Sequence, residues 1–378
     1  MVVNSFYRMM KGLTFVLASI AVIACTRGEF TVMDSGLSDR VVTFRAGMWL
    51  EGAVTKGQIP LENSTLFTMG VFGGYEEDDE SFNSLSVAND FIDNVRYTRS
   101  FITNPFAGAD VCYWPFSGKL SFFAYAPYIS STFLQFASDY VSGYPRMNYS
   151  PTTNVTDQPD FCIADPVLDR HMTTEPIPLV FHHSLSQILF SANYAGDLPA
   201  ITSTSSLYVK VDSIRICNVI GRKSVTMSNG NPCFEWQDDA VCPEADRTSY
   251  LIDRSKNQQL KDQALPKATD PISDNYMELT AVNGIANGVM YLLPQSMNYG
   301  EIFLNVYYGY YEMIGTTETL RASANTSCPL PEVEWLPTRA YRYKFTINLA
   351  QSSTVDVKVT VEKWKDINNT ESNPIHIE

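Results

Sequence analysis

Basic residues are scarce in this chain of 378 residues: 27 lysines and arginines face 41 aspartates and glutamates, which gives a formal net charge of −14. Proteins that bind nucleic acid need a basic face to meet the phosphates, so the charge argues against a nucleic-acid partner. It also argues against electrostatic attachment to an anionic lipid surface. We expect a soluble, acidic surface.

Recognisable catalytic and metal-binding motifs are also missing. The chain has no GxSxG, HExxH, Walker or GxGxxG motif and no CxxC pair. His182 and His183 are adjacent, and consecutive side chains of a strand point to opposite faces, so they cannot act as a metal pair. A hydrolase on a β-sandwich would need two carboxylates in one cleft, which the sequence neither locates nor excludes. We expect no enzyme activity, no cofactor and no metal.

Long amphipathic helices are absent from the pattern, whereas short alternating segments bounded by Gly, Pro, Asn and Asp recur along the chain. In YRYKFTINLA, for example, the residues Tyr343, Phe345, Ile347 and Leu349 share one face. The parity of residues 207–216 slips, which predicts a bulge near Ser213. The sequence predicts an all-β protein of two sandwiches, 41–198 and 199–378, with a polar insertion at about 221–274.

The stretch CYWPFSGKLSFFAYAPY, residues 112–128, is unusually aromatic. Ser117, Gly118 and Lys119 predict a turn, with a strand on each side forming a hairpin. From Leu120 to Ala126 both faces are apolar, which is typical of a strand covered on both sides. This segment is expected to be an inner strand.

The first 24 residues have the features of a secretory leader. Arg8 and Lys11 precede an apolar run, Leu13–Ala24, that is too short to span a bilayer. A small residue directly before Cys25 is typical of a bacterial lipobox, which predicts cleavage before Cys25 and lipid on its thiol. An ordinary signal peptide is the alternative. Residues 25–40 are then a propeptide or linker.

Six further cysteines follow Cys25. Export into an oxidising compartment would allow up to three disulfides, in any of 15 connectivities. The one local candidate is Cys233 with Cys242, which would close the loop CFEWQDDAVC.

Several segments in order suggest a family: YWPFSGKLSFFAYAPY, FHHSLSQILF, YLLPQ and a last strand ending at Trp364, together with the lipobox. The set resembles the fimbrillins, the lipoprotein pilins and accessory subunits of type V pili in certain Gram-negative anaerobes. The resemblance implies two tandem Greek-key sandwiches of transthyretin-like type. It also implies a lipid anchor in the cell outer membrane and assembly with other pilus subunits in a cell-surface fimbrium.

The resemblance further implies assembly by donor-strand exchange. A protease acting after Arg or Lys removes an N-terminal strand, and a strand from the next subunit replaces it. Candidate cleavage points are Arg40 and Arg45, with Arg40 preferred because Arg45 lies inside the first expected strand. One donor candidate is the segment VDVKVTV, with the alternating apolar residues Val355, Val357, Val359 and Val361; the alternative is that it is a permanent strand of its own sandwich. The other candidate is the C-terminal tail, with Ile375 and Ile377; the alternative is that it is a frayed terminus.

The expected function is therefore a structural or adhesive fimbrial subunit. The alternative is a monomeric surface lipoprotein that binds a glycan or a host protein through loops such as 221–274. A fimbrial subunit should be cut by a protease beyond the leader and form polymers, whereas the monomeric lipoprotein should do neither.

Overall fold

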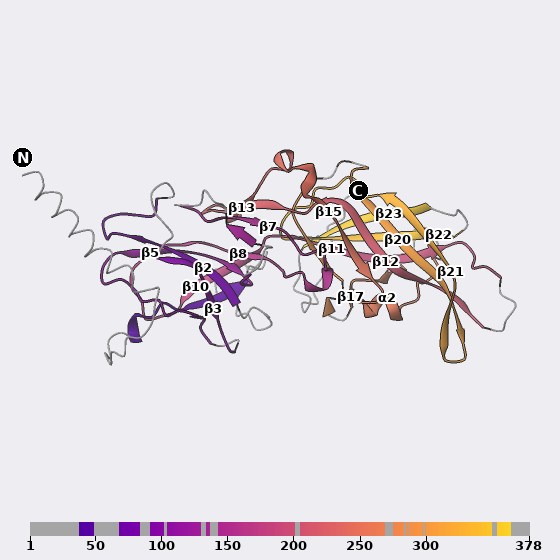
Figure 1. The fold of residues 1–378 in the computed structure, drawn as a ribbon, viewed down its shortest axis with the longest axis horizontal. Coiled ribbons are helices and arrows are strands. Elements are labelled where there is room, and N and C mark those ends of the chain that lie inside the picture. The colour runs from indigo at the N-terminus through magenta and orange to yellow at the C-terminus, as the bar shows by residue number, and fades with distance from the viewer. Residues whose placement is uncertain are drawn as a thin grey trace, which may run out of the picture.

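The computed structural model of the chain is an elongated molecule with two β-rich halves in a row (Figure 1). It describes residues 38–48, 68–83, 91–101, 104–129, 134–136, 143–200, 205–268, 275–282, 285–286, 288–296, 298, 300–349 and 354–363. Within these ranges the one α-helix, α2, is Gln258–Asp262, and Asn257 caps its N-terminus. No helix in the described ranges has the length and hydropathy to cross a membrane. The expected all-β class is confirmed.

The N-terminal half is built on a sheet of eight strands that curves around its own apolar face. Along the sheet the order is β1 (Phe44–Met48), β10 (Ile177–His183), β8 (Cys162–Ala164), β5 (Lys119–Ala126), β2 (Thr68–Glu76), β3 (Ile92–Thr98) and β4 (Ala107–Gly108), with β9 (Val167–Arg170) also paired to β5. Bridges between Phe44 and Phe106 and between Val41 and Tyr113 connect the two ends of this order. The sheet therefore closes on itself at β1.

A second sheet covers the outer face of the first. Its order is β14 (Phe234–Trp236), β13 (Lys223–Met227), β7 (Arg146–Tyr149) and β6 (Leu134–Phe136). Every residue of β5 is buried, because Phe122 packs inside the curved sheet and Phe123 packs between the two sheets. The expectation that this aromatic segment is an inner strand is confirmed.

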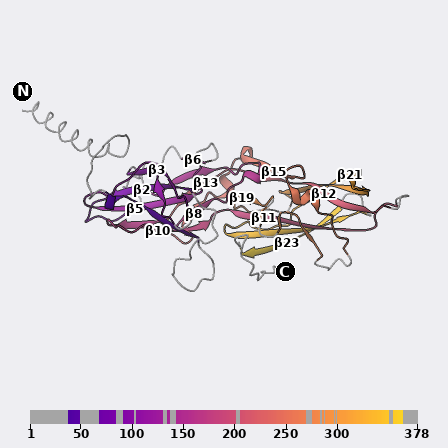
Figure 2. The same ribbon diagram turned by 90° about the horizontal axis from the view of Figure 1, so that it is seen from below.

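The C-terminal half is a sandwich of two sheets. One sheet holds β16 (Met277–Glu278), β11 (Ser186–Ala195), β22 (Arg339–Asn348) and β23 (Thr354–Lys363), with β19 (Met290–Leu292) paired to β11; the other holds β15 (Arg247–Asp253), β12 (Leu207–Ile220), β20 (Phe303–Ile314) and β21 (Thr317–Pro329). Figure 2 shows β12, β15 and β21 in one layer and β11 and β23 in the other. A small ribbon, β17 (Ala281–Val282) with β18 (Ile285–Ala286), stands apart.

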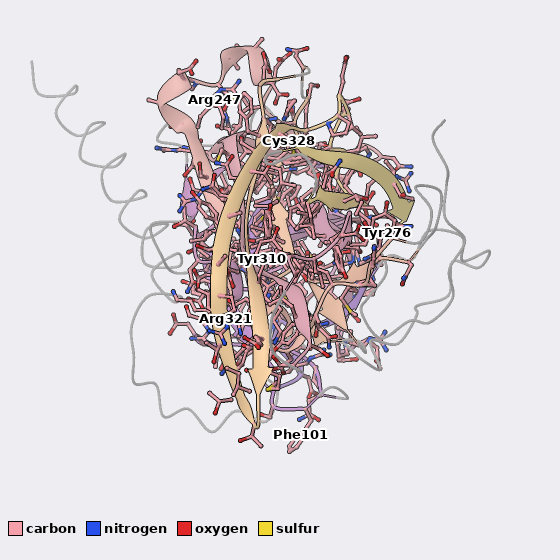
Figure 3. The ribbon with its side chains drawn as sticks, turned by 90° about the vertical axis from the view of Figure 1, so that its right-hand side faces the viewer. Phe101, Arg247, Tyr276, Tyr310, Arg321 and Cys328 are labelled. Carbon is pink, nitrogen blue, oxygen red and sulfur yellow. The ribbon has the colours of Figure 1, made fainter. Side chains whose placement is uncertain are left out.

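Alternation fixes the faces of this sandwich. Tyr343, Phe345 and Ile347 are fully buried in its core, as the period-two pattern predicts. The register of β12 against β20 shifts between Val211 and Ser213, which confirms the predicted bulge. Figure 3 shows β20 and β21 as a long hairpin, with Tyr310 and Arg321 on its two strands.

The two halves exchange segments along the chain. β11 begins at Ser186, before the expected division at 198/199, and pairs with β22 of the second half. In the polar segment 221–274, β13 pairs with β7 of the first half, whereas β15 pairs with β12 of the second. The predicted division into two domains, 41–198 and 199–378, stays a prediction.

One local prediction is wrong. Residues 112–116 form no hairpin strand with β5; instead Val42 donates a backbone hydrogen bond to the carbonyl oxygen of Cys112. The acidic run EEDDE, residues 76–80, begins inside the fold: Glu76 is 1% exposed at the end of β2. Its side chain turns inward toward the Ser121 hydroxyl, 3.3 Å from Oε2.

The burial of Glu76 predicts a pH-dependent stability. Burial, and secondarily the nearby charge of Asp169, raises the pKa of Glu76 to about 7, although Lys119 and the Ser121 hydroxyl oppose the rise. Between an unfolded pKa near 4.5 and this folded value, the folded state binds more protons. The free energy of unfolding therefore falls as pH rises through this window.

We expect Glu76→Gln, which stays neutral, to be more stable than the wild type at pH 8 by on the order of 1–3 kcal/mol, and similar to it near pH 4. Urea denaturation at several pH values measures the difference. The exposed neighbour Glu77→Gln is the control, and a Glu76→Gln profile parallel to wild type at every pH would refute the assignment.

Candidate assembly site

The backbone of the first strand is hydrogen-bonded on both sides. On one side β1 runs parallel to β10 from Phe44↔Ile177 to Met48↔Phe181. On the other side Val42 donates to the Cys112 carbonyl at 2.9 Å, and Phe44 and Phe106 exchange bonds of 3.2 and 2.7 Å. Removing this segment would leave the edge of β10 and the backbone groups of Phe106 and Cys112 unpaired, and unpaired groups of this kind can accept another strand.

The side chains of the segment alternate in the same way. Val42 and Phe44 are 1% and 0% exposed, whereas Arg45 is exposed. Phe44 meets Tyr97 and Phe122 edge to face, with ring centroids 4.9 and 5.2 Å apart. Such aromatic pairs stabilise a core beyond the area they bury. The segment thus fills two deep apolar positions in the closed sheet.

The two candidate cleavage points have different surroundings. Arg40 ends a short 3-10 turn, η2 (Ser38–Arg40), and its guanidinium donates to the carbonyl oxygens of Trp114 and Pro115 and lies over the Phe116 ring. Arg45 lies inside β1, opposite Pro178 of β10, and its side chain faces solvent.

The donor candidates are placed only in part. β23 pairs with β22 over its whole length and is the edge strand of its sheet. Val361 is 9% exposed in the sandwich core and Val357 packs against that core, so they serve their own domain. Val355 and Val359 lie on the same strand, opposite Ile347 and Tyr343. Ile375 and Ile377 lie outside the described residues, as does Cys25.

No disulfide joins the six cysteines of the described chain. The expected Cys233–Cys242 bond is not formed: the Cys233 sulfur lies 3.8 Å from the Ile163 carbonyl, and the Cys242 sulfur lies 3.5 Å from the Asp238 carbonyl. Burial raises the pKa of both thiols, which keeps them protonated. Burial also raises the pKa of the Cys328 thiol, to about 11.

The tyrosines of β20 do not form one exposed platform. Tyr308 and Tyr311 are buried, and Tyr311 donates to the Asp212 carboxylate at 2.5 Å. Tyr307, 45% exposed, is on the opposite face of the strand from Tyr308. Much of this aromatic surface is therefore committed to packing.

Sequence reasoning missed what lies beside each histidine. His182 and His183 do point to opposite faces, but each meets an aspartate and a cysteine there. His183 lies with Asp160 and Cys162, and His182 lies with Asp165 and Cys233. The spacing DFCIAD, with two aspartates around one cysteine, is the only local signal, because the strand pairing that completes each cluster is long-range.

A sequence model described as fimbrillin-like matches residues 68–364. A fimbrial protein of Bacteroides vulgatus superimposes with a TM-score of 0.58 at 15% identity, covering 85% of this chain and 99% of that one. A fimbrilin of Porphyromonas gingivalis matches with a TM-score of 0.34 at 9% identity, over 86% and 97% of the two chains. No curated protein matches the sequence.

The family match covers well over half of the chain, so the protein belongs to the fimbrillin-like family. The similarity to the Bacteroides vulgatus protein supports the same fold. The family is one of fimbrial subunits, which are structural and adhesive proteins of the cell surface and not enzymes.

The anchoring role of Phe44 is testable. We expect Phe44→Ala to lower the free energy of unfolding of the uncleaved chain by about 3–5 kcal/mol, because it empties a fully buried ring position. Urea denaturation measures the loss. Arg45→Ala, its exposed neighbour in the same strand, is the control and should change stability by no more than about 0.5 kcal/mol. Equal effects of the two substitutions would contradict this description of β1.

Proposed function

We propose that this protein is a fimbrial subunit that polymerises by donor-strand exchange at the position of β1. The observation that carries the proposal is the pairing of residues 44–48 with β10 on one side and of Val42 and Phe44 with Cys112 and Phe106 on the other, together with the burial of Val42 and Phe44. A donor strand restores the same backbone hydrogen bonds and fills the same apolar positions, so exchange costs little at equilibrium.

The cut that opens the groove falls after Arg45. A cut after Arg40 leaves the whole of β1 attached to the rest of the chain. A cut after Arg45 separates Val42 and Phe44 from it, so that only non-covalent contacts hold them. The exposed Arg45 side chain is available to a protease with a pocket for basic residues, although the local pairing with β10 must open first.

The donor in this proposal is the C-terminal tail rather than β23. Val361 belongs to the core of its own sandwich, so withdrawing β23 would expose that core. Ile375 and Ile377 are two residues apart, the same spacing as Val42 and Phe44. On an extended strand this spacing places both side chains on one face.

Head-to-tail exchange of this kind uses two different surfaces of each subunit and does not close, so it builds a filament. Before the cut, a lipid on Cys25 holds the subunit at the outer membrane. The cut after Arg45 removes that anchor together with the segment that carries Val42 and Phe44, so release and polymerisation are one event.

The proposal predicts which changes stop polymerisation. Treated with an arginine-specific protease, the chain should acquire Ala46 as its N-terminus and form a ladder of bands that resist mild detergent. Arg45→Ala should remain uncut there and monomeric, whereas Arg40→Ala should still polymerise. Deleting residues 373–378 should permit the cut but abolish the ladder. Gel electrophoresis and N-terminal sequencing measure polymer formation and the cut site for the wild type and the three variants.

A wild-type chain that stays monomeric after cleavage at Arg45 would contradict strand exchange and favour the monomeric surface lipoprotein. A ladder that survives deletion of 373–378 but is lost when β23 is altered would contradict the tail as donor. A ladder that requires Arg40 and not Arg45 would contradict the cut site.

A further inference from the structure

A cluster of three metal-ligating side chains lies where the loop before β8 meets the end of β10. Cys162 and His183 are directly opposite each other in the antiparallel β8–β10 pair, so their side chains share a face. The Cys162 sulfur lies 3.8 Å from Nδ1 of His183, and Oδ2 of Asp160 lies 2.6 Å from the same nitrogen. The three atoms lie within 4.8 Å of one another.

This arrangement differs from that of a nucleophilic cysteine. In a Cys–His–Asp relay the imidazole receives the thiol proton at one ring nitrogen and holds the carboxylate with the other. Here the sulfur and the carboxylate converge on one nitrogen, Nδ1. The three donor atoms are instead close enough to one another to share a single metal ion.

The surroundings favour a bound cation over a simple hydrogen bond. The side chain of His183 is 7% exposed, and Cys162 is 3% exposed. The second carboxylate oxygen of Asp160, Oδ1, is buried and has no hydrogen-bond partner in the described structure. A buried carboxylate oxygen without a partner is costly unless a charge satisfies it. The remaining 28% exposure of the Asp160 side chain gives a path from solvent.

We propose that Asp160, Cys162 and His183 bind a zinc ion. Zinc takes mixed sulfur, nitrogen and oxygen ligands in a tetrahedron, and its usual bond lengths would separate the sulfur and nitrogen by about 3.6 Å, close to the 3.8 Å observed. The Asp160 oxygen must move away from Nδ1 by less than about 1 Å, since the metal replaces the shared proton. Binding therefore releases the Cys162 thiol proton, the single ring proton of His183 moves from Nδ1 to Nε2, and water completes the fourth position.

The site is held by the backbone around it. Ser184, the residue after His183, donates to the carbonyl oxygen of Phe161 from both its amide, at 3.1 Å, and its hydroxyl, at 2.5 Å. This contact fixes the loop that carries Asp160 against the end of β10. Because β10 is also the partner of β1, the zinc ion stiffens the strand on which the exchange site is built.

The cluster on the opposite face of β10 supplies a matched control. Asp165, His182 and Cys233 are the same three residue types, with Nε2 of His182 2.8 Å from Oδ1 of Asp165. The Asp165 side chain is 46% exposed, so water satisfies it without a metal. Substitutions there test whether binding belongs to one particular cluster.

The experiment is a titration of the purified, metal-stripped chain with Co²⁺, whose thiolate charge-transfer and tetrahedral ligand-field bands report a cysteine ligand. We expect one equivalent to bind, with the bands lost in Cys162→Ser and retained in Cys233→Ser. Zn²⁺ should displace the cobalt and raise the melting temperature of the wild type but not that of Cys162→Ser. Asp160→Asn, a milder change, should weaken zinc binding about ten-fold or more.

Circular dichroism in chelator verifies that each variant is folded. No charge-transfer band in the wild type would overturn the proposal and leave an ordinary buried histidine–aspartate hydrogen bond. Bands that are lost in Cys233→Ser but kept in Cys162→Ser would overturn it as well, because the metal would then lie on the other face of β10.

Discussion

The closure of the first sheet by β1 is the interaction on which the N-terminal half depends. This short strand bonds to β10 on one side and to residues 106 and 112 on the other, and Phe44 fills the centre of the enclosed core. A strand with two bonded edges cannot leave without a substitute, because the exposed backbone and the emptied core positions would both be unfavourable. The same features make a replacement strand bind tightly.

The aromatic strand β5 connects the core that contains β1 to a second core. Its two faces contribute to two separate cores, one inside the curved sheet and one under the β14–β13–β7–β6 sheet. The second core includes no residue of β1, so removing β1 would empty none of its positions. Phe161 and Tyr149 stack there at 4.4 Å, next to the β8 strand that carries Cys162. The scaffold around the proposed exchange site therefore has its own packing.

The sequence predicted the fold well where the period-two alternation of apolar residues determines which face of a strand is buried. The all-β class, the buried face of β22, the bulge in β12 and the inner position of β5 all follow from alternation, which is a property of neighbouring residues. The missed features are long-range. Residues 112–114 bond to residues 40–42, just before β1, instead of forming a hairpin. Glu76 turns inward, and the two histidine clusters form only when β8, β10 and the segment at Cys233 come together. Period and composition carry no information about such pairings.

The central claim is that β1 is a temporary strand. N-terminal sequencing and intact mass of the protein in fimbriae recovered from the native cell surface test it most directly. The account predicts a chain that begins at Ala46, carries no lipid and occurs in high-mass polymers. A chain that begins at lipid-modified Cys25 and occurs only as a monomer would contradict it.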